Sequence, residues 1–199
     1  STTRIRSMKG SGSGCGIGGM SSAIALEKAG IDVEVFEAVQ EMKPVGAAIS
    51  IWPNGVKCLN ALGMKTALRE LGGNMAYMAY HDGATGTPLT RFSMAPLVKQ
   101  VGEYPCPVAR AELQAMLIDT FGRERVQFGK RVIQVEQTEN GVIATFSDNS
   151  QAHGDFLIAA DGTHSVVRHY VLEAKVERWY AGYVNWNGLA SKGECIAND

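Results

Sequence analysis

A glycine-rich turn near the start of the chain has residue types and spacing suited to holding a phosphate group. It runs Gly14-Cys15-Gly16-Ile17-Gly18-Gly19, and helix-like residues follow it up to Gly30. Backbone N–H groups at the start of such a helix stabilise a pyrophosphate, and glycine lets that group approach the backbone closely. The motif alone is weak, and its setting before a helix and a strand is what favours a dinucleotide site. The candidate cofactor-binding residues of this turn are Gly14, Gly16, Gly18 and Gly19.

An acidic residue follows at the distance that such a site requires. The alternating run Val33-Glu34-Val35-Phe36 predicts a strand, and Glu37 comes directly after it. A carboxylate at this position accepts hydrogen bonds from the hydroxyls of an adenosine ribose. The alternative is a solvated glutamate at the end of a strand, and the sequence leaves both interpretations open.

A second group of polar residues is more specific than the glycine turn. An apolar strand over residues 156–160 ends in Asp161-Gly162, and a helix begins again at Ser165. This order places polar atoms at the mouth of a parallel sheet, where ligands of α/β proteins bind. We interpret His164, which stands beside the helix start, as a polar neighbour of the nucleotide rather than as a base.

The remaining pattern supplies elements that would position these residues. Apolar residues at helical spacing predict an amphipathic helix over residues 110–121, and residues 75–81 and 88–92 predict a hairpin outside the dinucleotide core. We expect residues 43–51 to form a loop and residues 93–107 to lack regular secondary structure. Further predicted helices cover residues 20–29, 53–62 and 64–71, and further strands cover residues 126–128, 131–137, 142–146 and 179–189.

Composition narrows the class of protein. The 199 residues are 45% hydrophobic and 20% charged, which suits a globular core. The net charge is -1 and no basic stripe is present, so we expect no nucleic-acid partner. The sequence predicts no span of ~20 apolar residues and hence no membrane partner. The cysteines lack metal-ligand spacing, so we expect no metal and a cytoplasmic location; they are Cys15, Cys58, Cys106 and Cys195.

These motifs resemble a known family. The glycine turn, the helix start Arg110-Ala111-Glu112-Leu113 and the Asp161-Gly162 segment look like the three first-half motifs of the group A flavoprotein monooxygenases, the aromatic hydroxylases. Residues 43–55 and 180–189 closely resemble the bacterial FAD-dependent urate hydroxylases. The resemblance runs from Met8 almost to the end of the chain, and members of the family are about twice this length.

The resemblance implies an α/β fold, namely a Rossmann-like FAD-binding βαβ domain of the aromatic hydroxylase type with the beginning of a β-rich substrate domain. It implies that FAD, NADH and molecular oxygen serve the hydroxylation of urate to 5-hydroxyisourate. Matching positions make Gly18, Glu37, Ala38, Ser50, Arg110 and Val132 contacts of FAD and Asn185 a contact of the purine. The alternatives are that Arg110 is only a surface charge and that Asn185 satisfies a strand end or turn. The resemblance assigns no catalytic side chain and no oligomeric state.

The domain boundaries follow from the same resemblance. We expect residues 1–7 to be a leader or tag outside the fold. Residues 8–74 and 103–175 would form the FAD-binding domain, and residues 75–102 and 176–199 a truncated part of the substrate-binding sheet.

One segment departs from the family pattern. Gly10-Ser11-Gly12-Ser13 stands where the apolar first strand of the sheet is expected, and glycine and serine are poor strand formers. Loss of about four buried aliphatic side chains at ~1.5–3 kcal/mol each rivals a typical total stability of ~5–15 kcal/mol. The sequence therefore predicts a damaged fold. Two alternatives to urate hydroxylation stay open: a flavin monooxygenase acting on a phenolic or other aromatic ring, and a non-catalytic fragment.

Overall fold

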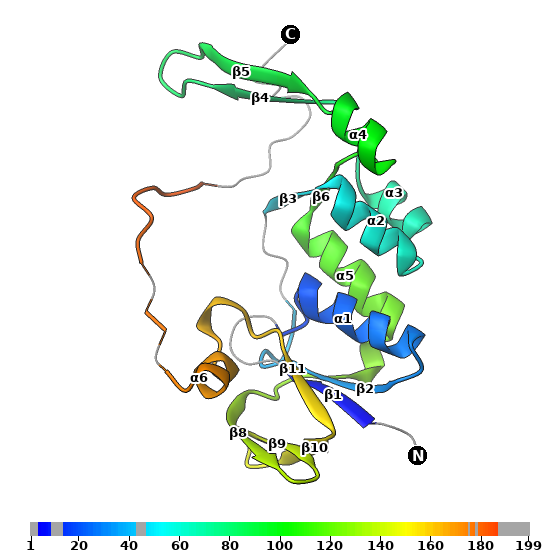
Figure 1. Ribbon diagram of the computed structural model, residues 1–199, viewed down its shortest axis with the longest axis vertical. Helices are drawn as coiled ribbons and strands as arrows, with labels where there is room; N and C mark the ends of the chain where they lie inside the picture. The colour runs from blue at the N-terminus through cyan, green and yellow to red at the C-terminus, as the bar shows by residue number, and fades with distance from the viewer. Residues whose placement is uncertain (1–3, 9–13, 43–46, 175, 178, 187–199) are drawn as a thin grey trace. The chain divides into compact units, whose positions relative to one another are not determined.

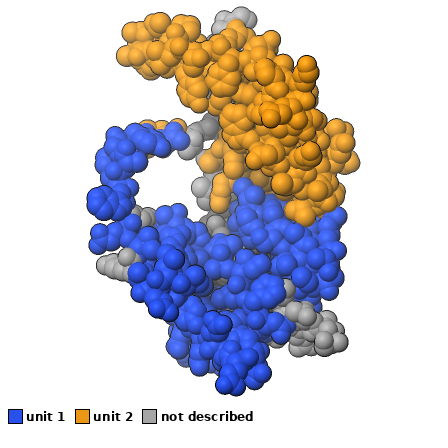
Figure 2. All heavy atoms as spheres, viewed as in Figure 1, with its two compact units in different colours: residues 1–44, 114–185 blue, residues 45–113, 186–199 orange. Residues whose placement is uncertain are grey.

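A computed structural model describes residues 4–8, 14–42, 47–174, 176–177 and 179–186 (Figure 1). The chain folds as two compact units (Figure 2). Unit 1 comprises residues 1–44 and 114–185, and unit 2 comprises residues 45–113 and 186–199. Within the described residues, no helix has both the length and the apolar character that crossing a membrane requires.

A four-stranded parallel sheet organises unit 1. Its strand order is β11-β1-β2-β7, and every neighbouring pair runs parallel. The α1 helix, Ile17–Lys28, connects β1 to β2 and completes a βαβ unit. Parallel strands end at the same edge, so the loops that leave them gather there. The four strands are β1 (Arg4–Met8), β2 (Asp32–Phe36), β7 (Val126–Gln127) and β11 (Phe156–Ala159).

The first strand differs from the expectation. Residues 4–7, which were expected to belong to a leader outside the fold, form β1 together with Met8 in the interior of the sheet. Ile5 lies opposite both Val33 of β2 and Phe156 of β11. The Gly10–Ser13 run, which was expected to occupy this place, lies outside the described residues. The predicted loss of the first strand is therefore wrong, because an earlier segment supplies its backbone ladder.

Unit 1 also contains an antiparallel sheet of order β10-β9-β8. Its strands are β8 (Val132–Thr138), β9 (Gly141–Phe146) and β10 (Gln151–Gly154). The predicted turn between β8 and β9 is confirmed, and Gly141 there has φ 134°. The rings of Phe36 and Phe146 lie 4.8 Å apart between centroids. They belong to one buried cluster, Phe36, Val132, Val135, Ala144, Phe146, Ala152 and Val167.

Four further helical elements belong to unit 1 or lead into it. The α5 helix covers Arg110–Phe121, as predicted, and the 3₁₀ turn η1 covers Arg123–Arg125. Arg125 bonds the carboxylate of Glu27 at the end of α1 and lies 4.2 Å from the Phe121 ring centroid. A second 3₁₀ turn, η2 (Gly162–His164), precedes α6 (Val167–Leu172).

Unit 2 is built from helices and two small antiparallel sheets. The strand β3 (Ala48–Ile51) pairs with β6 (Cys106–Ala109), and β4 (Tyr77–His81) forms the predicted hairpin with β5 (Pro88–Ser93). Pro53 begins α2 where the sequence predicted a helix start. The helices are α2 (Pro53–Ala61), α3 (Lys65–Leu71) and α4 (Ala95–Val101).

Three predicted segments differ from the structure. Residues 93–107, read as irregular, contain α4 and β6; Pro96 lies in the first turn of α4, and Gly102 at φ 89° ends it. Residues 48–51, read as loop, form β3, because β6 supplies a pairing partner from far along the chain. Residues 179–186 contain no strand, and the rest of that predicted stretch, 187–189, lies outside the described residues.

Removal of residues 1–8 tests the position of β1. We expect the shortened chain to lose its cooperative thermal transition in circular dichroism, because an interior strand carries ladder bonds on both sides. Removal of residues 1–3 alone is the control, since it leaves all of β1 in place. A chain without residues 1–8 that melts like the parent would contradict this arrangement.

Candidate nucleotide-binding site

The polar segments predicted from sequence follow neighbouring strands at one edge of the unit 1 sheet. Glu37 follows β2 directly, and Asp161 comes two residues after the end of β11. Met8, the last residue of β1, lies opposite Ala159 of β11. Because these strands are parallel, the glycine turn, Glu37 and Asp161 share the carboxyl edge of the sheet, where α/β proteins bind ligands.

The N-terminus of α1 is open to an anion. Gly16 is its N-cap, with φ −67° and ψ 165°, and neither a side-chain cap nor an acidic first-turn residue is present. The first helix-type bond runs from Met20 N to Gly16 O, so the preceding N–H groups have no helical acceptor. Gly18 is exposed, and a Cβ built on it would meet no atom within 4 Å. Unpaired donors, the helix dipole and free space together suit a pyrophosphate.

Glu37 is bound to the glycine turn. Its side chain is fully buried, at 0% exposure. One carboxylate oxygen accepts a hydrogen bond from Cys15 N, and the other accepts one from Val39 N at 3.0 Å. The interpretation of Glu37 as a solvated strand end is therefore wrong. A contact of this carboxylate with a ribose stays a prediction, and the lone pairs that Cys15 and Val39 leave on its two oxygens would accept the hydroxyls.

The amide of Gln114 also holds the glycine turn. Gln114 lies in α5 with 6% exposure, and its Nε2 donates to Cys15 O at 2.7 Å. Sequence analysis missed this residue. The available signal was a polar residue beside Leu113 on the apolar side of an amphipathic helix, where burial requires a hydrogen-bond partner. Both polar groups of Cys15 are thus held by side chains, one from the end of β2 and one from α5.

The Asp161-Gly162 segment is fixed by its own hydrogen bonds. The Asp161 carboxylate is 2% exposed and accepts bonds from Val166 N at 2.8 Å and Val167 N at 3.2 Å, at the start of α6. The guanidinium of Arg168 donates to Gly162 O at 2.8 Å. A cavity of about 710 Å³ borders this segment. The Asp161 side chain therefore shapes the loop, and Gly162, which has no side chain, lines the cavity with its backbone.

The other residues predicted in unit 1 have different surroundings. Ala38 is half-buried beside Glu37. The Val132 side chain is 1% exposed within the buried cluster. A contact of Val132 with FAD would therefore be made by its backbone. Asn185 is exposed and lies outside any helix or strand. The structure thus brings Glu37 to the glycine turn, buries Val132 in the core cluster and leaves Asn185 exposed.

Two predicted contacts belong to unit 2. Ser50 is an exposed residue of β3. Arg110 is half-buried at the first position of α5, as predicted, and its backbone N–H donates to Ala47 O at 2.9 Å. That bond joins the start of α5 to the residue before β3, so Ser50 and Arg110 stand on joined segments of one unit.

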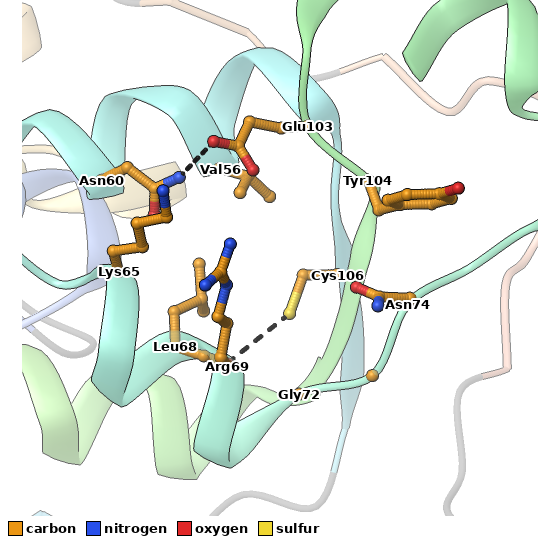
Figure 3. Close-up of a pocket in the computed structure, with 11 residues that line it drawn as sticks. Val56, Asn60, Lys65, Leu68, Arg69, Gly72, Asn74, Glu103, Tyr104 and Cys106 are labelled. Carbon is orange, nitrogen blue, oxygen red and sulfur yellow. Dashed lines mark hydrogen bonds between the residues drawn. The ribbon is translucent and has the colours of Figure 1, made fainter. Parts of the chain in front are cut away.

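Unit 2 also holds a separate polar cavity of about 460 Å³, between α2, α3 and the segment before β6 (Figure 3). Arg69 points into it, and Asn60 donates to the Glu103 carboxylate at 2.7 Å. Cys106 lies at its wall and donates to Leu68 O at 3.9 Å. Burial raises the pKa of the Cys106 thiol, which keeps it neutral. None of the predicted cofactor contacts lines this cavity.

A βαβ unit whose uncapped helix faces the carboxyl edge of a parallel sheet defines a dinucleotide-binding α/β protein. The sequence pattern of the FAD binding domain family matches residues 13–186. The chain therefore belongs to this family of FAD binding domains.

Several relatives make the similarity specific. The FAD-dependent urate hydroxylase of Klebsiella oxytoca is 58% identical over 184 residues, and that of Klebsiella pneumoniae is 55% identical over 184 residues. Each alignment covers 92% of this chain and 48% of the relative, so the chain spans about half the length of the relatives it matches. The crystal structure of Klebsiella pneumoniae HpxO with FAD and uric acid superposes with a TM-score of 0.83 and 50% identity, over 94% of this chain and 46% of that one.

Substitution of Glu37 tests its role in nucleotide binding. Glu37→Ala removes both carboxylate acceptors and frees the turn, whereas Glu37→Gln keeps one acceptor and the volume. Since a hydrogen bond to a charged group contributes ~1.5–3 kcal/mol, Ala should weaken FAD roughly 10- to 100-fold and Gln less. Flavin fluorescence titration gives the two dissociation constants. Glu41→Ala, at an exposed glutamate, is the control, and equal affinity of all variants would exclude the role.

Substitution of Gly72 tests the packing around Cys106. A Cβ on Gly72 would lie 2.2 Å from Cys106 Sγ and 3.0 Å from Pro107 O, whereas a Cβ on Gly73 would meet nothing nearer than 3.9 Å. Overpacking of this kind costs ~1–3 kcal/mol, so Gly72→Ala should lower the free energy of unfolding in urea and Gly73→Ala should not. Adding Cys106→Ala to Gly72→Ala should recover part of the loss. Equal losses at the two glycines would refute the close packing.

Proposed function

We propose that this chain binds FAD at the carboxyl edge of the unit 1 sheet. The observation that carries the proposal is the uncapped start of α1 beside the exposed Gly18, which offers free N–H groups and open space to a pyrophosphate. The similarity to an FAD-containing structure at 50% identity supports the same ligand. Contacts of FAD with Ala38, Ser50, Arg110, the Val132 backbone and Gly162 belong to this proposal.

We further propose that the reaction is the NADH-dependent hydroxylation of urate to 5-hydroxyisourate. Identities of 55% and 58% to urate hydroxylases favour urate over a phenolic substrate. Bound FAD would supply the redox chemistry by accepting electrons from NADH and delivering them to molecular oxygen. No side chain of this chain need form a covalent bond to the substrate. The proposed role of its residues is to bind and orient FAD and the substrate.

The roles of the chain's own residues follow from their chemistry. Backbone N–H groups of the glycine turn and α1 would hold the pyrophosphate, and Glu37 would accept ribose hydroxyls. The Arg110 guanidinium has donors in a fork that matches phosphate or carbonyl oxygens. The Asn185 amide offers both a donor and an acceptor to the edge of a purine.

A flavin-binding and turnover experiment tests both proposals. We expect the 199-residue chain to take up FAD, seen as flavin absorbance after gel filtration, and to show no urate-stimulated NADH consumption alone. Fusion to the remaining half of the Klebsiella oxytoca relative should produce urate-stimulated NADH consumption, because that relative supplies the part of its length beyond this alignment.

Three other outcomes would each exclude a part of the proposal. Urate turnover by the chain alone would refute the need for further residues. Stimulation of the fusion by salicylate and not by urate would favour the phenolic alternative. Absence of flavin from both the chain and the fusion would favour a non-catalytic fragment.

A further inference from the structure

We propose that Gln114 is a positioning residue for the pyrophosphate-binding turn, because it fixes which way the Cys15–Gly16 peptide faces. The inference rests on the proposed binding of FAD. Gln114 Nε2 donates to Cys15 O at 2.7 Å, and the side chain is 6% exposed. A buried hydrogen bond between an amide and a carbonyl is strong in this low-dielectric setting and costly to leave unmade.

Because the peptide is planar, this hydrogen bond also fixes the direction of the Gly16 N–H. No described peptide bond is cis, so the C=O and N–H of the Cys15–Gly16 peptide point in opposite directions. With the carbonyl held by Gln114, the N–H of Gly16 points away from Gln114. Gly16 is the N-cap of α1, and its N–H is one of the donors that no helical carbonyl satisfies.

A flipped peptide would reverse the charge that the turn presents. The carbonyl oxygen of Cys15 would then face outward, where its partial negative charge would repel a pyrophosphate. The Gly16 N–H would face Gln114 instead. Glycine at position 16 makes such a flip sterically accessible, since it tolerates backbone angles that other residues avoid. A side chain that donates to the carbonyl is therefore needed to select the orientation that binds anions.

Glu37 completes the restraint from the other side of Cys15. Its carboxylate accepts the N–H of Cys15, so the peptides before and after this residue are each held by a side chain. Glu37 can only accept and the inward-facing nitrogen of Gln114 can only donate. This pairing of an acceptor and a donor matches one orientation of the turn and opposes the flipped one.

Two substitutions of Gln114 separate positioning from packing. Gln114→Leu keeps most of the volume and removes the donor, and we expect it to weaken FAD about tenfold. Gln114→Glu keeps the shape, but its ionised carboxylate repels the Cys15 carbonyl and accepts the N–H of a flipped peptide. At about pH 8 this variant should bind FAD more weakly than the Leu variant.

The pH dependence of the Glu variant is the decisive measurement. As pH falls from about 8 to about 5, its introduced carboxyl becomes protonated and can donate to Cys15 O, so FAD affinity relative to the parent should rise. Gln134→Glu, at an exposed position of β8, is the matched charge control and should follow the parent at every pH. A purely structural role would lower the melting temperature without this recovery of affinity.

A flavin-independent measurement separates this inference from the proposed function. In NMR of the parent chain without FAD, we expect a scalar coupling across the hydrogen bond from Gln114 Nε2 to the Cys15 carbonyl carbon, and slow exchange of that amide. If the parent binds FAD but the Glu variant follows the Gln134→Glu control, the positioning role is refuted. If the parent binds no FAD, the proposed function is refuted, and a missing coupling refutes the orientation of the peptide as well.

Discussion

The parallel pairing of β1 with both β2 and β11 is the constraint on which the nucleotide site depends. Each of these strands is followed by one part of the site: the glycine turn after β1, Glu37 after β2, and Asp161 after β11. Only a common strand direction brings these three parts to one edge. Without β1 between them, β2 and β11 would have no shared partner, and α1 would have no strand to follow.

Hydrogen bonds from buried side chains hold the short turn at Cys15 in one conformation. Glu37 and Gln114 are among the few buried polar side chains in the described residues, and both bond to Cys15. Burial strengthens each bond. If the turn moves, water cannot replace the lost bond, so movement of the turn is costly. Glu37 has two tasks in the proposed site, because its carboxylate holds the turn and would also accept the ribose hydroxyls.

Sequence patterns predicted the helices and strands that are specified by residues close together in the chain. The α5 helix was predicted with its exact bounds because apolar residues recur at helical spacing from Arg110, and the β8–β9 hairpin was predicted from a turn with Gly141. β1 was not predicted, because Arg4-Ile5-Arg6-Ser7-Met8 lacks the continuous aliphatic run that is typical of interior parallel strands. Its assignment depends on pairing with distant residues. β3 was missed for the same reason.

The site could be predicted where a spacing rule exists. The rule placed Glu37 at the end of β2, and the structure has it there. No spacing rule marks Gln114, since a single glutamine in a helix gains meaning only when the turn that it bonds is close in space. The buried side chain of Val132 likewise could not be foreseen, because it depends on the packing of Phe36 against Phe146.

The place of β1 in the sequence also sets an order of events during synthesis. β1 is made before both of its neighbours and can pair with β2 early, whereas its other neighbour, β11, is made much later. At a translation rate of ~5–20 residues per second, one edge of β1 waits on the order of ten seconds for its partner. During that interval its backbone N–H and C=O groups are unpaired, and such edges recruit strands from other chains. A sheet whose interior strand is made before both of its neighbours therefore exposes an unpaired edge until β11 emerges.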